Sequence, residues 1–249
     1  MSGSLRICAR QCVVLIAMSV SARQPVAAQQ RQLLEDPGIH SPTVGQRGMV
    51  VSQNAMASQA GAAIIRQGGN AVDAAVAMGF VLAVTLPRAG NIGGDGFMLV
   101  HDAASGRDVF FDFRSVAPRS ATLSMFLDNQ GREAALASRG YRAPSVPGTV
   151  AGLYLAHQRF GRLPWADVVA PAIALARDGV RLTPDEAFVF SWGQERLSTS
   201  DAARSTYYKP DGSLYSAGEV LRQPDLAWTL RQIARRGADG FYRGPVAQR

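Results

Sequence analysis

The sequence predicts a layered protein of helices and strands, of the α+β or α/β class. Three observations support this class. Residues 71–84 are apolar on nearly every helical face, which is typical of a helix buried between layers. Residues 96–114 contain two strand-like runs separated by Ala-Ser-Gly, which indicates a β-hairpin. After residue 146, several segments open on proline and close on glycine, as helices commonly do.

The first predicted elements precede the hairpin. Residues 48–52, Gly-Met-Val-Val-Ser, indicate a short apolar strand. Residues 54–67 are predicted to form a helix of small residues that ends at a Gly-Gly pair. Asn70 then begins the buried helix, and Asp73 completes a capping-box-like pair with it. The alanines and the glycine of that helix predict close packing against a sheet.

Helices dominate the second half of the predicted fold. The first opens with Thr149 as N-cap. The next spans 164–179, where Pro171 is expected to kink it or to split it into two short helices. Thr183 is predicted as the N-cap of a third helix, and residues 223–237 repeat the proline start and glycine stop.

Composition and charge favour a globular protein with a sizeable core. The 249 residues are 47% hydrophobic and 18% charged, which argues against disorder. The formal net charge is +7, and Lys209 is the only lysine among the cationic residues. Because the arginines are scattered and form no basic stripe, we interpret them as surface charges and predict no nucleic-acid partner.

The first residues have the pattern of an export signal. Arg6 and Arg10 precede a short apolar run at 13–20, and a Val-x-Ala cleavage pattern ends at Ala28, with a second option ending at residue 22. We therefore predict a signal peptide over 1–28 and a periplasmic or secreted protein. Removing three arginines and no acid with this leader lowers the net charge from +7 to +4.

The mature chain is predicted to contain no disulfide or thiol chemistry, since both cysteines, Cys8 and Cys12, lie in the leader. A polar tether is expected over 29–47, followed by the folded part over 48–249. No further segment is long and apolar enough for a transmembrane helix, so no membrane role beyond export is predicted.

Several kinds of site are disfavoured by their missing motifs. The three histidines, at 40, 101 and 157, have no metal-ligand spacing, and no Gly-x-Ser-x-Gly elbow occurs. The glycine-rich segment 90–96 leads into a strand, whereas a dinucleotide fingerprint must open a helix. No metal and no cofactor are predicted, and Gly93, Gly94 and Gly96 are expected to serve tight packing.

Six segments together resemble the gamma-glutamyltranspeptidase family, and they follow its order and approximate spacing between Gly48 and Arg249. They are GMVVSQNAMASQAGAAIIRQGGNAVDAAVA, GNIGGDGFMLV, DFRSVAP, SVPGTVAGL, FGRLPWADVVAPAIALARDGV and FYRGPVA. The resemblance implies an N-terminal-nucleophile hydrolase with an αββα sandwich. It also implies that 48–249 is a C-terminally truncated large subunit.

The resemblance implies an activity as well. In this family a precursor cuts itself, and the new N-terminal threonine of the small subunit is the nucleophile. The γ-glutamyl group of glutathione or another γ-glutamyl compound passes to water, an amino acid or a peptide. The family's self-cleavage threonine motif does not occur in this sequence, and Thr149 and Thr183 are predicted internal helix caps. No catalytic residue is therefore assigned, the chain alone is expected to be inactive, and a small subunit is its expected partner.

Arg114 ends the apolar run Phe-Phe-Asp-Phe-Arg at the close of the hairpin. As a pattern alone, it fits a surface arginine paired with Asp112 or a neighbouring acid. The resemblance places Arg114 on the family's arginine that binds the α-carboxylate of the γ-glutamyl group. A guanidinium makes a two-bond fork with a carboxylate, which orients as well as attracts. Arg114 is the one predicted substrate-binding residue.

Two positions depart from the family pattern. Asp95 stands where many relatives have glycine, and Ser115 stands where many have glutamate after the arginine. If that glutamate steers the arginine, its loss loosens substrate binding or alters the preference among acyl groups. Two other functions stay open: a cephalosporin-acylase-like amidase of the same fold, and a non-catalytic exported remnant or binding protein.

Overall fold

The computed structural model describes residues 44–46, 48–133, 140 and 142–249. The predicted leader lies outside these residues. Of the predicted tether only 44–46 are described, and they are exposed and belong to no helix or strand. The compact unit runs from Gly48 to Arg249.

Helices are the main elements of this unit, which also contains two short antiparallel sheets. The longer helices are α2 (Ala55–Arg66), α3 (Ala71–Thr85), α4 (Thr149–Phe160), α5 (Trp165–Asp178), α6 (Pro184–Trp192) and α9 (Pro224–Arg236). The shorter ones are η2 (Leu123–Phe126), α7 (Gln194–Leu197), α8 (Asp201–Tyr207), α10 (Asp239–Tyr242) and α11 (Pro245–Gln248). The strands are β1 (Phe97–Asp102) paired with β2 (Arg107–Asp112), and β3 (Val180–Arg181) paired with β4 (Val220–Leu221).

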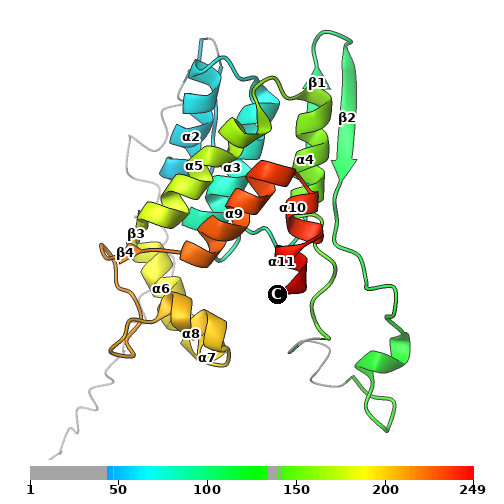
Figure 1. Cartoon of the computed structure of the whole chain (residues 1–249), viewed down its shortest axis with the longest axis vertical. Coiled ribbons are helices and arrows are strands. Elements are labelled where there is room, and N and C mark those ends of the chain that lie inside the picture. Colours follow the sequence, from blue (N-terminus) through cyan, green and yellow to red (C-terminus); the bar gives the residue numbers. More distant parts are fainter. Residues whose placement is uncertain (1–43, 47, 134–139, 141) are drawn as a thin grey trace, which may run out of the picture. The chain divides into compact units, whose positions relative to one another are not determined.

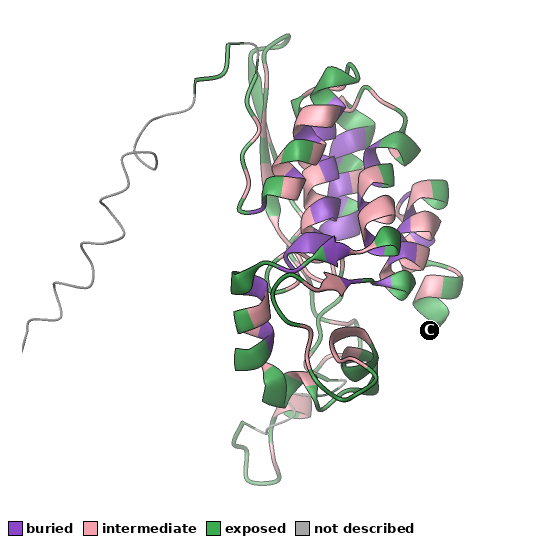
Figure 2. Ribbon diagram, turned by 90° about the vertical axis from the view of Figure 1, so that its left-hand side faces the viewer, coloured by how far each residue is buried: buried purple, intermediate pink, exposed green. Residues whose placement is uncertain are grey.

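Helix α3 is the centre of the helical layer. It packs against α2, α4 and α5, and α9 in turn covers α5 (Figure 1). Figure 2 shows the buried residues gathered on the facing sides of these helices. Phe80 and Val81 are fully buried on α3, and each such side chain stabilises the fold by roughly 1.5–3 kcal/mol. The predicted buried helix is confirmed; its main neighbours among the described residues are helices, and its packing on a sheet stays a prediction.

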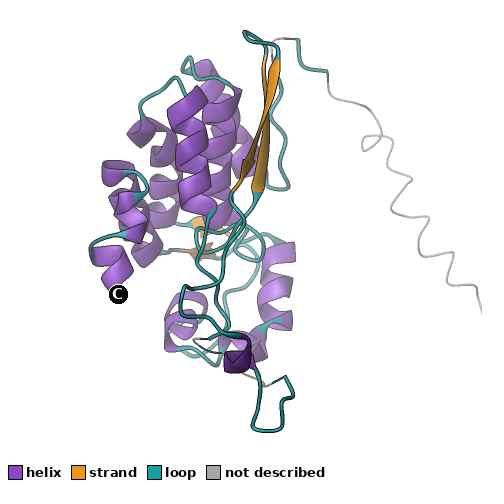
Figure 3. Ribbon diagram, turned by 90° about the vertical axis from the view of Figure 1, so that its right-hand side faces the viewer, coloured by secondary structure: helices purple, strands orange, loops and turns teal. Residues whose placement is uncertain are grey.

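The β-hairpin lies along one side of the helical layer (Figure 3). Its turn closes at Gly106, whose φ of +65° favours glycine. Inward side chains such as Val109 and Phe111 pack on the helical core, and the Phe111 ring meets Phe160 of α4 edge-on at 6.0 Å between centroids. The outward face stays exposed and apolar, with Phe97 stacked on Phe110 at 5.6 Å. The described residues thus hold one helical layer and one hairpin of a strand layer.

The buried carboxylate of Asp73 ties the start of α3 to the turn between α4 and α5. It accepts hydrogen bonds from the main-chain N–H groups of Asn70 (2.9 Å), Arg162 (3.0 and 3.1 Å) and Leu163 (3.4 Å). The Asn70 side chain caps α3 in return, and its Nδ2 donates to the carbonyl of Phe160 at 2.5 Å. The predicted capping pair is confirmed, and it also serves as a tertiary contact.

Residues 48–52 form no strand, contrary to the sequence prediction. Val50 packs against the core, while Met49 and Val51 are 54% and 74% exposed. A strand needs hydrogen-bonded neighbours. The described part of the chain provides none beside this segment.

Two other local predictions also needed correction. Thr149 is the first residue of α4 and Gly148 is its N-cap, because the Thr149 hydroxyl donates instead to the Asn91 side chain at 2.9 Å. Helix α5 continues through Pro171 as one helix, so the expected split is wrong, while the expected kink at Pro171 stays a prediction. Packing of its buried face against α3 and α9 compensates for the main-chain hydrogen bond that a proline cannot donate. Thr183 does cap α6, as predicted. Across the described residues, no helix combines the length and apolarity needed to cross a membrane.

Replacing Asp73 tests its structural role. In the complete protein that carries this segment, Asp73→Ala leaves three main-chain N–H groups without an acceptor, so we expect the free energy of unfolding to fall by roughly 3 kcal/mol or more. Asp73→Asn keeps one acceptor oxygen, so its free energy of unfolding should lie between those of Asp73→Ala and the wild type. Denaturant unfolding measures the difference. The matched control is Asp167→Ala, since Asp167 is an exposed acid in the first turn of α5, and we expect a change within about 0.5 kcal/mol.

Candidate substrate-binding site

Arg114 lies two residues beyond the end of β2, where the chain leaves the hairpin. The register pairs Phe97 with Asp112, and the N–H of Phe113 still donates to the carbonyl of Gly96 at 3.2 Å. Continuing this register by one more pair places Asp95 opposite Arg114. The Arg114 side chain is 66% exposed, so its guanidinium is accessible to a ligand.

Asp95 binds both the guanidinium and the main chain of this segment. Its Oδ1 accepts from Nη1 of Arg114 at 3.1 Å. Its Oδ2 accepts from the N–H of Ser115 at 3.1 Å and from the hydroxyl of Ser115 at 2.5 Å. Asp95 is 21% exposed, less than the arginine that it pairs with. Within the described residues this is the one hydrogen bond of the guanidinium, which has five N–H donors.

The charge of this acid is favoured by its surroundings. The hydroxyl and the N–H of Ser115 lower the pKa of Asp95, and the positive charge of Arg114 contributes in the same direction. A carboxyl group with a lowered pKa stays ionised at neutral pH, and its stabilising contribution is lost only as pH falls through that lowered value. The Asp95–Arg114 pair is therefore fully charged under physiological conditions.

The glycine-rich loop is fastened to the start of α4. The carbonyl of Gly94 accepts from the N–H groups of Gly148 (2.8 Å) and Thr149 (3.1 Å). The side-chain oxygen of Asn91 accepts from the N–H of Gly94 (2.8 Å) and from the hydroxyl of Thr149 (2.9 Å). These contacts fix the loop that carries Asp95, so the position of the acid depends on α4.

Close packing explains some of the glycines of this site. A Cβ at Gly148 would lie 2.1 Å from the carbonyl oxygen of Phe113, and one at Gly96 would lie 2.8 Å from the Phe113 ring. A Cβ at Gly94 would meet the Asn91 side chain, whereas one at Gly93 would meet nothing within 4 Å. The expected packing role thus holds for Gly94 and Gly96 but not for Gly93.

The partner of Arg114 is one that the sequence prediction missed. Asp112, the acid named as a possible partner, accepts from the main-chain N–H of Arg114 at 2.9 Å and makes no ion pair with its side chain. Asp95 makes that pair instead. Counting outward from the observed Asp102–Arg107 pair brings Asp95 opposite Arg114, whereas the predicted Ala-Ser-Gly turn is one residue shorter and would bring Gly96 there.

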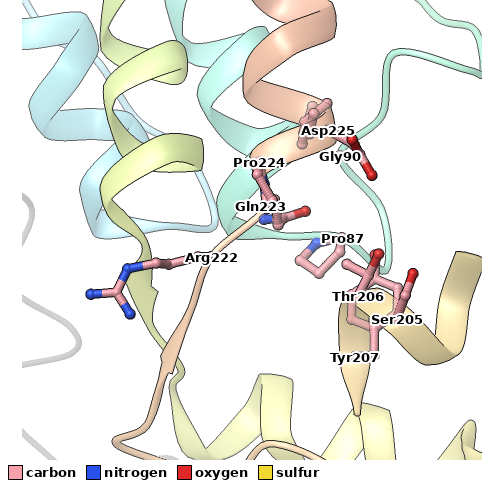
Figure 4. Close-up of a pocket in the computed structure, with 11 residues that line it drawn as sticks. Pro87, Gly90, Ser205, Thr206, Tyr207, Arg222, Gln223, Pro224 and Asp225 are labelled. Atoms are coloured by element: carbon pink, nitrogen blue, oxygen red, sulfur yellow. The ribbon is translucent and has the colours of Figure 1, made fainter. Parts of the chain in front are cut away.

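A separate pocket of about 370 Å³ lies between the end of α8 and the start of α9 (Figure 4). Two of its hydroxyl groups are engaged locally, since Ser205 and Thr206 both donate to the carbonyl of Ala202 in their own helix. The Gln223 side chain donates to the carbonyl of Val84 at 2.9 Å. Arg114 does not line this pocket, and no nucleophile paired with a base is found among its residues.

Thr149 and Thr183, the two threonines weighed in the sequence analysis, lie at helix termini. Thr149 donates to Asn91, and the Thr183 hydroxyl accepts from the N–H of Glu186 at 3.2 Å. No group of three or more His, Cys, Asp or Glu side chains among the described residues is arranged to hold a metal ion. What the described site can do is bind an anion through Arg114.

Comparison with known proteins gives concordant matches. The family model described as gamma-glutamyltranspeptidase matches residues 57–249. The glutathione hydrolase proenzyme of Escherichia coli (strain K12) is 41% identical over 232 residues, which are 92% of this chain and 39% of that protein. The chain therefore spans about two fifths of the length of this relative.

Solved structures agree with the sequence matches. The crystal structure of Helicobacter pylori gamma-glutamyltranspeptidase superposes with a TM-score of 0.81 at 41% identity, covering 84% of this chain and 60% of that one. A cephalosporin acylase from Bacillus halodurans gives a TM-score of 0.71 at 32% identity, covering 86% and 42%. These neighbours confirm the predicted N-terminal-nucleophile hydrolase fold, of which the described residues form part.

The tight contact at Gly148 predicts a pair of contrasting variants. Gly148→Ala places a methyl group against the main chain of Phe113, next to Arg114, and should destabilise the complete protein by about 1–3 kcal/mol. Gly93→Ala in the same site meets open space and should stay within about 0.5 kcal/mol of the wild type. Thermal unfolding of both variants compares them directly. Equal melting temperatures would show that the start of α4 and the main chain at Phe113 are not in close contact.

Proposed function

Because this chain belongs to the gamma-glutamyltranspeptidase family, we propose that it is the N-terminal part of the large subunit of an exported enzyme of that activity. The complete protein transfers the γ-glutamyl group of glutathione and related compounds to water, amino acids or peptides. The support is the match over 57–249 together with relatives named glutathione hydrolase proenzyme. No cofactor is proposed.

The observation that carries this proposal is the exposed guanidinium of Arg114, held at the end of the hairpin. An α-carboxylate fits such a group because two N–H donors lie side by side in one plane. The edge formed by Nε and Nη2 makes no hydrogen bond with the described residues, so it is open to a ligand. In this role Arg114 binds and orients the donor and takes no part in bond making.

The nucleophile and the remaining strands are proposed to come from outside the described residues. The name proenzyme, carried by the relatives, fits a precursor that cleaves itself and exposes an N-terminal threonine. The outward face of the hairpin supports a further layer. Phe97, Leu99 and Phe110 are 57%, 71% and 61% exposed, an unusual arrangement for large apolar side chains of neighbouring strands. We propose that strands of the same precursor, including those of its small subunit, cover this face.

A second candidate is an amidase with another acyl donor. The similarity to the Bacillus halodurans cephalosporin acylase favours it, because that enzyme shares the fold at 32% identity. The two candidates differ in the group that Arg114 binds. Comparing turnover of a γ-glutamyl anilide with turnover of a cephalosporin amide, in the complete protein, separates them.

Export is also proposed, on the pattern of the first residues alone. Arg6, Arg10 and the apolar run 13–20 precede the cleavage pattern at Ala28. We expect the mature protein to begin near Gln29 and to occur outside the cytoplasm. N-terminal sequencing of the protein from a fractionated host checks this, and an intact Met1 on cytoplasmic protein would contradict it.

Substituting Arg114 tests the proposed function. In the complete protein, Arg114→Lys keeps the charge but loses the fork, and Arg114→Ala loses both. A desolvated charge pair is worth on the order of 2–5 kcal/mol, so kcat/KM for the donor should fall by about 30-fold or more in the alanine variant. The lysine variant should lose less.

Self-cleavage should survive in both variants, because that step uses no donor carboxylate. The deciding measurement is donor kcat/KM after processing of each protein has been confirmed. If Arg114 were only a surface charge, the three values would be nearly equal.

A further inference from the structure

We propose that Asp95 is a positioning residue that holds the Arg114 guanidinium in the orientation in which it binds the donor α-carboxylate. The proposal rests on the proposed function of Arg114. It adds a second residue to the site, on the glycine-rich loop, that does not itself touch the substrate.

The division of labour between the two oxygens of Asp95 is the first argument. Oδ1 accepts from Nη1 of Arg114, and Oδ2 accepts from the N–H and the hydroxyl of Ser115. One carboxylate therefore joins the end of a long, exposed side chain to the main chain next to it. Asp95 is itself fixed, since its neighbour Gly94 is bound to the start of α4.

The position of the contact is the second argument. Asp95 engages Nη1 only, on one side of the guanidinium. The opposite edge, formed by Nε and Nη2, makes no hydrogen bond within the described residues and can still present a two-bond fork. An exposed arginine has many rotamers, and restricting them before binding lowers the entropy lost when the ligand arrives. Asp95 thus orients Arg114 without occupying its binding edge.

The position of Ser115 indicates that a carboxylate beside Arg114 could be supplied from residue 115 as well as from residue 95. Its hydroxyl lies 2.5 Å from Oδ2 of Asp95, so a longer acidic side chain at 115 would bring its carboxylate to the space that Asp95 now fills. An exchange variant, Asp95→Gly with Ser115→Glu, moves the acid to the other segment. If the role of Asp95 is to supply an oriented carboxylate, this exchange restores the donor preference that removal of Asp95 weakens.

The test uses the complete, self-processed protein and two donors: a γ-glutamyl anilide with a free α-carboxylate, and the same anilide with an α-carboxamide. For Asp95→Ala we expect KM for the carboxylate donor to rise about tenfold, with kcat within about twofold, since donor binding is weakened and the chemical step is not. The preference for the carboxylate donor over the carboxamide donor should fall by a similar factor. Asp95→Asn should lose less of this donor preference than Asp95→Ala, and the exchange variant should recover most of it.

The matched control is Asp128→Ala. Asp128 also accepts main-chain N–H groups and pairs with an arginine, Arg132, at 3.0 Å, but it makes no contact with Arg114. This variant should keep the wild-type donor preference. A general loss of charge or stability would affect both donors alike, whereas a positioning role changes their ratio.

Each outcome supports or overturns the proposal. An unchanged donor preference in Asp95→Ala overturns the proposal. A lower KM for the carboxylate donor in that variant also overturns it, because Asp95 would then only weaken the attraction of Arg114 for anions. If Asp95→Ala fails to process, Asp95→Asn decides by the same ratio. Absence of γ-glutamyl turnover in the wild type would instead refute the proposed function. If Arg114→Ala loses turnover while the Asp95 variants keep wild-type turnover and donor preference, this inference is refuted and the proposed function stands.

Discussion

The buried carboxylate of Asp73 is the constraint on which the helical layer depends. A charged group with no exposure is tolerated only when hydrogen bonds replace its water. The donors come from its own helix cap and from the turn about 90 residues later. His157 packs beside it, donating from Nε2 to the carbonyl of Leu163 at 3.0 Å, and Trp165 closes the cluster with an edge-on ring contact. Two distant segments are therefore held in one arrangement.

Helix α4 extends this constraint to the substrate-binding site. Its last residue meets the Asn70 side chain, and its first turn binds the glycine-rich loop. With 12 residues, α4 is about 18 Å long, so it acts as a rigid spacer between the Asp73 cluster and Asp95. The hairpin packs along the same helix through Phe111 and delivers Arg114 to the place where the loop ends. The site is exposed, but the glycine-rich loop and the hairpin that form it are both held in place by their contacts with α4.

Local structure was predictable wherever the conformation depends on a few neighbouring residues. The caps at Asn70 and Thr183 are examples, as are the hairpin and the helix over 223–237, because turn geometry and capping depend on side chains within three or four positions. The failures share another cause. A strand at 48–52 would need a hydrogen-bonded neighbour, which the local pattern cannot reveal. Thr149 does not cap α4, because its hydroxyl donates to Asn91, which lies 58 residues earlier. The unbroken α5 depends on packing against α3 and α9 that no local window contains.

The sequence by itself determined that the chain is a layered protein of helices and strands, and it singled out Arg114 as an arginine at a strand end. It did not determine the register, because the observed turn is one residue longer than the predicted Ala-Ser-Gly and a hairpin's turn sets every pair beyond it. Only the tertiary structure decided that Asp95, and not Asp112, pairs with the guanidinium. The reason is geometric: Asp112 is two residues away and reaches the main-chain N–H of Arg114, whereas the loop bound to α4 brings the Asp95 carboxylate to the end of the side chain.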